Sequence, residues 1–226
     1  MADHKIEAGH YIPTAIPTDA RGIASGESVS LCYALKEGME APAMDFLLME
    51  GASLDLTILA YPGFSGRLLV RVFLCGRNAN ANLRGAWIGR GSDKLNLDVE
   101  MHHTVGSCTS EQDFRGVLDN EAVSYFDGRI VVAPDAAATK ALQQNHNILL
   151  SESSRAETRP QLEIYTDDVE CSHGATVGAL DANELFYMRS RGIPEADAKA
   201  LQLRSFLHPV LAGLDEEARE EFLSVL

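Results

Sequence analysis

The stretch PQLEIYTDDVECSHGATVGALDANELFYMRSRG, Pro160–Gly192, changes from the pattern of a β-strand to that of an α-helix. Near its start, Leu162 and Ile164 alternate with polar residues, as expected of a strand that buries one face. Asp181 is a suitable N-cap for the helix, and Gly192 is a suitable residue to end it. The stretch therefore marks the boundary between a β region and a helical region.

A thiol and an imidazole stand two residues apart within this stretch. Successive side chains of a strand point to opposite faces, so Cys171 and His173 share one face and Ser172 lies on the other. Such a pair can bind a thiophilic metal, activate a thiolate or simply fill a core. Their Cβ atoms would be about 7 Å apart, too far for a direct thiolate–imidazolium contact unless the rotamers converge. The local sequence leaves the three interpretations open.

The residues before this stretch predict many short strands. Apolar runs of strand length occur at residues 46–49, 54–60, 67–74 and 95–101, with glycines between them. Such a pattern is typical of a sandwich, a barrel or a β-solenoid. No fixed-period repeat selects one of these folds.

The same patterns predict the domain organisation. We expect a β core at residues 1–180 and a C-terminal helical segment at residues 181–226. Residues 1–40 are rich in Gly, Pro, Ser and Thr, which predicts an irregular lead-in to the core. The run DAAATKALQQNH, Asp135–His146, has high helix propensity and predicts a short helix or lateral loop in place of another strand.

Two further helices are expected in the C-terminal segment. Pro194 begins the first, which should end before Pro209, and Asp215 begins the second. Apolar residues fall on one face of each helix. These faces predict that the helices cover an open end of the β core.

The composition suits a globular domain of 226 residues, 46% hydrophobic and 23% charged. A formal charge of -14 repels the phosphate groups of nucleic acids, so we expect no nucleic-acid partner. The four cysteines contain no CxxC pair and we expect no secretory leader, which indicates a reducing compartment and a cytoplasmic location. No apolar run approaches the roughly 20 residues that span a bilayer, so we expect no membrane association.

Common catalytic signatures are missing from the sequence. It contains no GxxxxGK[ST], so we expect no nucleotide hydrolysis by this chain. His102 and His103 are adjacent and would face opposite sides of a strand, so they cannot readily bind one metal together. The carboxylates near the Cys171 strand are weak candidates for recruiting ferrous iron. They are Glu163, Asp167, Asp168 and Glu170.

Several longer segments form a specific pattern. The most specific is DVECSHGATVG, with PQLEI before it and LFYMRSRGI after it. The others are HH at His102 and His103, SEQDFRGVLDNEAVSYFDGRIVV at residues 110–132 and QQNHNILLS at residues 143–151. Together they closely resemble the SufB/SufD family of iron-sulfur cluster assembly proteins, and the SufD branch fits best. The resemblance covers roughly residues 94–206 and implies a mainly β fold, with a right-handed parallel β-helix core and a C-terminal α-helical segment. The chain is too short for the N-terminal helical region of longer SufD proteins.

The resemblance implies a scaffold subunit and not an enzyme. Cys171 and His173 would lie at a cluster-assembly interface with a SufB-type subunit, as metal ligands for iron or a cluster held transiently in the complex. The isolated chain would bind no cofactor stably. A SufC-type ATPase would bind the C-terminal helices. The residues expected at that contact are Leu185, Phe186, Arg189, Arg191, Leu203 and Phe206.

Alternatives to this interpretation remain. The chain could be a SufB-like homodimeric scaffold, and it could form a homodimer in isolation. A cysteine-dependent enzyme using Cys171 and His173 is less favoured because of their separation. A carbohydrate-active β-helix lacks an identified pair of carboxylates.

Overall fold

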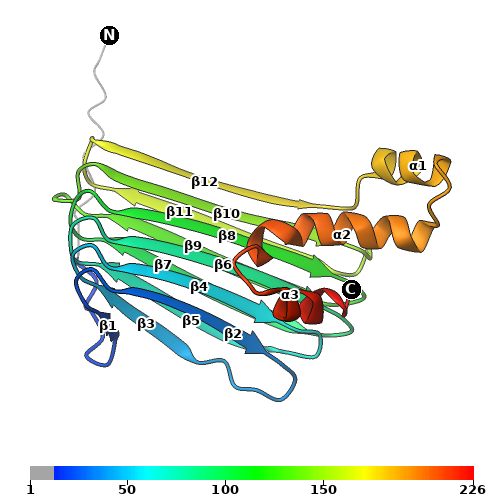
Figure 1. The fold of residues 1–226 in the computed structure, drawn as a ribbon, viewed down its shortest axis with the longest axis horizontal. Helices are drawn as coiled ribbons and strands as arrows, with labels where there is room; N and C mark the ends of the chain where they lie inside the picture. The colour runs from blue at the N-terminus through cyan, green and yellow to red at the C-terminus, as the bar shows by residue number, and fades with distance from the viewer. Residues whose placement is uncertain (1–12) are drawn as a thin grey trace, which may run out of the picture.

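The computed structural model describes residues 13–226, in which the chain alternates between two six-stranded parallel sheets and ends in three helices (Figure 1). One sheet holds β1 (Arg21–Ile23), β3 (Ala43–Leu48), β5 (Gly66–Leu74), β7 (Lys94–His103), β9 (Val123–Val132) and β11 (Arg155–Ile164). The other holds β2 (Ser28–Leu35), β4 (Ser53–Ala60), β6 (Asn80–Gly89), β8 (Thr109–Leu118), β10 (Thr139–Leu149) and β12 (Val169–Gly178). The helices are α1 (Ala182–Ser190), α2 (Glu195–Leu211) and α3 (Glu216–Leu223). The expected mainly β, parallel solenoid with a C-terminal helical segment is confirmed.

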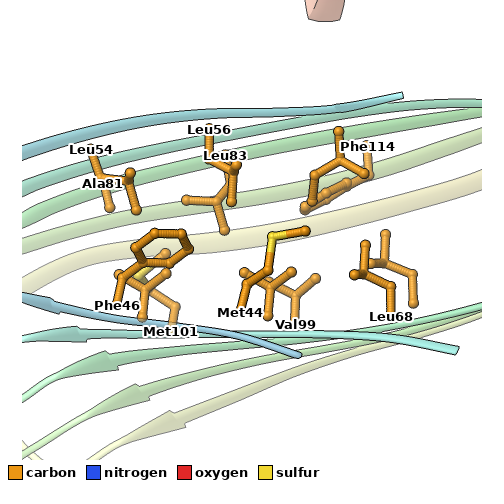
Figure 2. Close-up of a cluster of buried hydrophobic side chains, with 14 of the residues drawn as sticks. Met44, Phe46, Leu54, Leu56, Leu68, Ala81, Leu83, Val99, Met101 and Phe114 are labelled. Atoms are coloured by element: carbon orange, nitrogen blue, oxygen red, sulfur yellow. The ribbon is translucent and has the colours of Figure 1, made fainter. Parts of the chain in front are cut away.

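Alternating apolar residues build the core between the two sheets. Leu54 and Leu56 of β4 face inward from one sheet, and Val70 and Val72 of β5 face inward from the other; all four are fully buried. Figure 2 shows such side chains of the two sheets pointing toward one another. Each coil stacks on the next through parallel backbone pairing, so one face of every strand enters a continuous core.

The coils differ in length, which hides the repeat in the sequence. Leu54 pairs with Ala81, Ala81 with Ser110 and Ser110 with Ala141, in steps of 27, 29 and 31 residues. The turns between strands absorb these differences. A search for a fixed period therefore finds none, although the coils are regularly stacked.

Residues 135–146, expected to form a helix or loop, instead lead into strand β10. Ala141, Gln143 and Asn145 alternate inward and are buried. β10 pairs along its length with β8 on one side and β12 on the other. This backbone pairing and burial override the local helix propensity.

The lead-in expected at residues 1–40 is also only partly irregular. β1 and β2 both lie within it, and β2 pairs in register with β4. Val29, Leu31 and Tyr33 of β2 alternate on the side that packs against the core. Residues 1–12 lie outside the described residues.

The helices begin where the sequence predicts. The Asp181 side chain accepts hydrogen bonds from the backbone N–H groups of Asn183 at 2.8 Å and Glu184 at 3.1 Å. Asp215 accepts from the N–H of Ala218 at 2.8 Å and caps α3. Pro194 stands at the N-cap of α2, as expected for the start of that helix.

The sequence predicted that α2 ends before Pro209. This prediction is wrong, because the helix continues through Pro209 to Leu211. Leu207, Val210 and Leu211 are buried on both sides of the proline in sequence. Their burial holds the last turn in place and offsets the hydrogen bond that a proline cannot donate.

α2 and α3 pack against the outer face of the sheet formed by β2, β4, β6, β8, β10 and β12, which we call the even-numbered sheet (Figure 1). They do not cover an open end of the solenoid, although the sequence predicted that they would. Leu203 and Leu207 of α2 and Phe222 of α3 join a second buried cluster with outward residues of that sheet. Tyr61 and Phe222 meet edge to face with ring centroids 5.0 Å apart. The helices cover this face because its strands carry apolar residues outward as well as inward near their C-terminal ends. None of the three helices in residues 13–226 is long and apolar enough to cross a membrane.

Candidate functional site

Cys171 and His173 lie on β12, the last strand of its sheet. β12 pairs with β10 on one side, and its other edge pairs with no strand in residues 13–226. In register, Cys171 is the partner of Ala141 and His173 is the partner of Gln143. Both partners are buried side chains of the solenoid interior. Cys171 and His173 therefore share one face of β12, as the alternation predicted, and this face is the interior side at the end where the solenoid is open.

The interior changes from apolar to polar toward this end. One inward column of the even-numbered sheet contains Ser110, Ala141 and Cys171, and the next contains Gln112, Gln143 and His173. Beneath the same columns lie Ala81 and Leu83. Gln143 donates from Nε2 to Oε1 of Gln112 at 3.0 Å, and both side chains are fully buried. A polar side chain, Gln143, thus lies in the core directly behind His173, whereas Ala141 lies behind Cys171.

β11 forms the other half of the open end. It pairs with β9, and its second edge pairs with no strand within the described part of the chain. Leu162 is half-buried against the core, whereas Ile164 is 41% exposed. The apolar alternation predicted here is present, but its outermost side chain is uncovered. Two parallel strand edges and a partly apolar rim therefore face solvent together.

The Cys171 thiol is held in its neutral form. Burial raises its pKa, and a hydrogen bond with the backbone of Ala141 lowers it in part. Binding of a metal requires the thiolate, so a metal or a cationic partner group would have to displace the proton. No Cys171–His173 hydrogen bond is present among residues 13–226, so the geometry of an activated dyad is not formed there.

The nearby carboxylates do not converge on this pair. Glu170 points to the opposite face of β12 and forms an ion pair with Lys140, N to O 2.9 Å. Glu163 pairs with Arg129 at 3.4 Å on the other sheet. Within residues 13–226, no three His, Cys, Asp or Glu side chains are grouped to hold a metal ion.

His102 and His103 face opposite sides of β7, as predicted, and both are buried. His103 lies in the interior with Nε2 2.9 Å from Oγ of Ser110. His102 stacks on Phe73 with ring centroids 4.7 Å apart and lies 2.9 Å from Glu100. Burial lowers the pKa of both imidazoles, that of His103 to about 3. These contacts are those of packed structural histidines.

A groove of about 730 Å³ lies between α1, α2 and the end of β10. Tyr187 of α1 and Leu201 of α2 line it and are 60% and 50% exposed. No residue of α1 is buried, so this helix has an unpacked apolar surface. In Figure 1, α1 stands away from the sheets and α2 lies along them.

The six residues predicted to contact an ATPase differ in exposure. Phe186 is 74% exposed and is not among the residues that line the groove, and Leu185 is half-buried. Arg189 and Arg191 are exposed on the same helix end, with Arg191 over the ring of Tyr187 at 5.3 Å.

Of the two predicted residues of α2, Leu203 serves the fold, whereas Phe206 is half-buried and lines the groove. Leu203 is 6% exposed and packs against the sheet, so it is not available to a partner. The backbone carbonyl of Phe206 accepts from Nη1 of Arg115 at 2.6 Å. The helical spacing of apolar residues in the sequence does not show which of them face the sheet and which face outward on α2.

A family model describes most of this architecture. The model of the SUF system FeS cluster assembly SufBD core domain matches residues 36–206, from the end of β2 into α2. The chain belongs to the SufBD family. The match includes β12 with its thiol and imidazole, and both strands of the open end.

Curated SufBD relatives agree with this assignment. The iron-sulfur cluster assembly protein SufD of Escherichia coli is 33% identical over 183 residues, 79% of this chain and 41% of the relative. The SufD protein of Bacillus subtilis is 28% identical over 229 residues, 96% of this chain and 52% of the relative. An iron-sulfur cluster assembly SufBD family protein of Synechocystis is 37% identical over 123 residues, 54% of this chain and 27% of the relative. The chain therefore spans about half the length, or less, of these relatives.

Sequence reasoning on this SufBD core missed the buried amides behind His173. Gln112 and Gln143 look like ordinary surface residues when each strand is considered alone. Their common register becomes visible only when β8 and β10 are aligned. An alternating polar series at the inward positions of β10, namely Gln143, Asn145 and Asn147, is the signal that could have revealed it.

Proposed function

We propose that this chain is a SufD-type scaffold subunit in iron-sulfur cluster assembly. The observation that supports the proposal is the position of Cys171 and His173 on β12, whose outer edge pairs with no strand in residues 13–226, at an open end of the solenoid. A soft thiolate and an imidazole are suitable ligands for iron and its clusters. The nascent cluster is cargo in this scheme, built at the interface and passed on.

A SufB-type subunit is the partner that we propose for the open end. The outer edges of β11 and β12 pair with no strand in the described part of the chain, so another solenoid can extend both sheets there by strand addition. Burial of Leu162 and Ile164 would add an apolar contribution. Clusters are generally held by about four protein ligands, so Cys171 and His173 would need others from the partner.

A SufC-type ATPase is the partner that we propose for the groove between α1 and α2. Tyr187 in the groove and Phe186 next to it on α1 offer exposed aromatic anchors, and Arg189 and Arg191 offer cationic groups. Aromatic and arginine side chains are enriched in the energetic centres of interfaces. α2 also packs on the sheet, so a movement at the groove can reach the core of the solenoid.

The test is anaerobic reconstitution with ferrous iron and sulfide, using the chain with its SufB-type and SufC-type partners. We expect His173→Ala to keep the circular dichroism spectrum and partner binding, and to reduce the iron-sulfur absorbance several-fold. Cys171→Ser should give a smaller loss because this thiol is partly packed in the core. Ser172→Ala is the matched control, since Ser172 lies on the outer face of the same strand. A normal cluster yield from His173→Ala would contradict the proposal.

Native mass measurement of the isolated chain addresses the alternative of a homodimeric scaffold. The same edges could pair with a second copy, which would supply another Cys171 and His173. A stable dimer that forms clusters without a SufB-type subunit would favour that alternative. A monomer that forms clusters only with the partner would favour the SufD-type assignment.

A further inference from the structure

Two hydrogen-bonded glutamine side chains lie in the solenoid core in the same column as His173. Gln112, Gln143 and His173 occupy one inward column of β8, β10 and β12 in continuous register. Nε2 of Gln143 donates to Oε1 of Gln112 at 3.0 Å. Both amides are fully buried, so solvent cannot satisfy their remaining groups.

Gln143, the glutamine in register with His173, has an unused acceptor. Oε1 of Gln143 is buried and has no hydrogen-bond partner within residues 13–226. The two polar atoms of an amide point in diverging directions. Nε2 of Gln143 points toward β8, and the neighbouring strand on the other side of β10 is β12, where His173 is the register partner. A buried acceptor without a partner destabilises the fold, which favours a donor at this position.

We propose that Gln143 is a positioning residue for His173. The His173 side chain turns so that one imidazole N–H donates to Oε1 of Gln143, a bond that is not formed in residues 13–226 as described, and this bond fixes the tautomer of the ring. The other nitrogen then keeps its lone pair free at the open end of the solenoid, where a metal can reach it. A metal-binding histidine usually needs an acceptor of this kind for its second nitrogen.

This inference deepens the proposed function and rests on it for its consequence, since a fixed lone pair matters only if His173 binds iron. The tautomer itself can be measured without iron or partners. Failure of the positioning role and failure of the proposed function are therefore separate results.

The experiment uses the full chain labelled with ¹⁵N at about pH 8, where a histidine of ordinary pKa is neutral. Long-range ¹H–¹⁵N spectra report the shifts of both ring nitrogens, and His173→Ala identifies the signals. We expect two well-separated nitrogen shifts for His173, as for a single tautomer. In Gln143→Leu we expect the shifts to move toward the averaged values of the exposed His208.

Gln112→Leu is the matched control. It places the same side chain in the same column but keeps the Gln143 amide, whose Oε1 can still accept from His173, so His173 should keep its single tautomer. Averaged shifts in the parent protein would overturn the proposal, as would unchanged shifts in Gln143→Leu. Equal averaging in both leucine variants would also overturn it, because it would indicate a general loosening of the last coil.

A second readout connects the tautomer to metal binding. In the complex with a SufB-type subunit, we expect Gln143→Leu to weaken ferrous iron binding about 10-fold or more, and Gln112→Leu to change it much less. A fixed tautomer in the parent, together with normal cluster yield from His173→Ala, would retain the positioning role and reject the proposed function.

Discussion

Gly116 allows two neighbouring coils to bring polar side chains together inside the core. It is the register partner of Trp87 on one side and of Asn147 on the other. A Cβ atom on Gly116 would lie 2.1 Å from Nε1 of Trp87 and 2.4 Å from Oδ1 of Asn147. Both side chains are buried, so neither can move aside into solvent. Only a glycine fits at this position, because the two neighbouring side chains leave no room for a Cβ atom.

We therefore expect Gly116→Ala to lower the free energy of unfolding by about 1–3 kcal/mol, the usual cost of overpacking a core. Gly22→Ala is the control, because a Cβ at Gly22 meets nothing within 4 Å. Urea unfolding of both variants measures the effect. Equal midpoints for the two variants would show that the core can adjust around Gly116.

His103 couples the stability of the core to pH. Burial lowers its pKa from 6.5 to about 3, with a smaller contribution from the neighbouring His102. The unfolded chain takes up a proton near the ordinary pKa, whereas the folded protein resists it down to about pH 3. Stability is therefore complete above pH 6.5 and decreases as the pH falls through this window.

We expect this decrease to be smaller in His103→Gln, which keeps a polar group beside Ser110 but does not titrate. The contribution of one histidine is at most about 1.4 kcal/mol per pH unit. Unfolding midpoints of parent and variant at pH 7, 6 and 5 measure the difference in slope. Parallel curves would show that His103 is not the group responsible.

At the scale of single elements, α1 is the helix with the least support from the rest of the molecule. No residue of α1 is buried, and its packing is mainly against α2. Its cap at Asp181 and the bond from Nε2 of Gln202 to Glu184, 2.9 Å, are exposed. Such an element should open locally far more often than the sheets.

We expect the amides of α1 to exchange rapidly in the isolated chain and to become protected when a SufC-type ATPase binds. Phe186→Ala should weaken that binding at least about 10-fold without changing the unfolding midpoint, because its side chain is 74% exposed. Phe222→Ala is the contrasting variant. It empties a buried site against Tyr61 and should cost about 3–5 kcal/mol of stability. Unchanged exchange in α1 on ATPase binding would place the contact elsewhere.

Local sequence predicts some elements better than others for physical reasons. The caps at Asp181 and Asp215 act within a few residues, so the helix starts could be predicted from sequence. β10 depends on pairing with strands about 30 residues away on both sides, which its own composition does not reveal. The same distance separates Gln112 from Gln143, and for that reason their ladder was missed while the spacing of Cys171 and His173 was informative.

At the scale of the whole molecule, the two ends of the even-numbered sheet carry different cysteines. Cys32 is exposed on β2 at one edge, and Cys171 is on β12 at the other. Partial desolvation raises the pKa of both thiols, so both should react slowly with alkylating reagents at neutral pH. The alkylation rates of Cys32 and Cys171 can therefore show at which end of the sheet a partner binds.

We expect a SufB-type subunit to slow alkylation of Cys171 several-fold and to leave Cys32 unchanged. Variants that keep only one of these cysteines allow each rate to be followed by mass spectrometry. If assembly is coupled to movement, a non-hydrolysable ATP analogue added to the complex with the ATPase should change the Cys171 rate. Slower labelling of Cys32 in place of Cys171 would show that the partner binds the opposite end.

The change of core composition along the solenoid should also order its folding and opening. Stacked coils contact only their neighbours, so each coil contributes its own share of the stability. The coils around β4 and β5 bury Leu54, Leu56, Val70 and Val72, whereas the last coil rests on amides and has an uncovered face. Folding should then nucleate in the apolar coils and reach β12 last, and thermal fluctuation should detach β12 first. The strand that carries Cys171 and His173 could thus release and rebind its contacts while the rest of the stack stays folded.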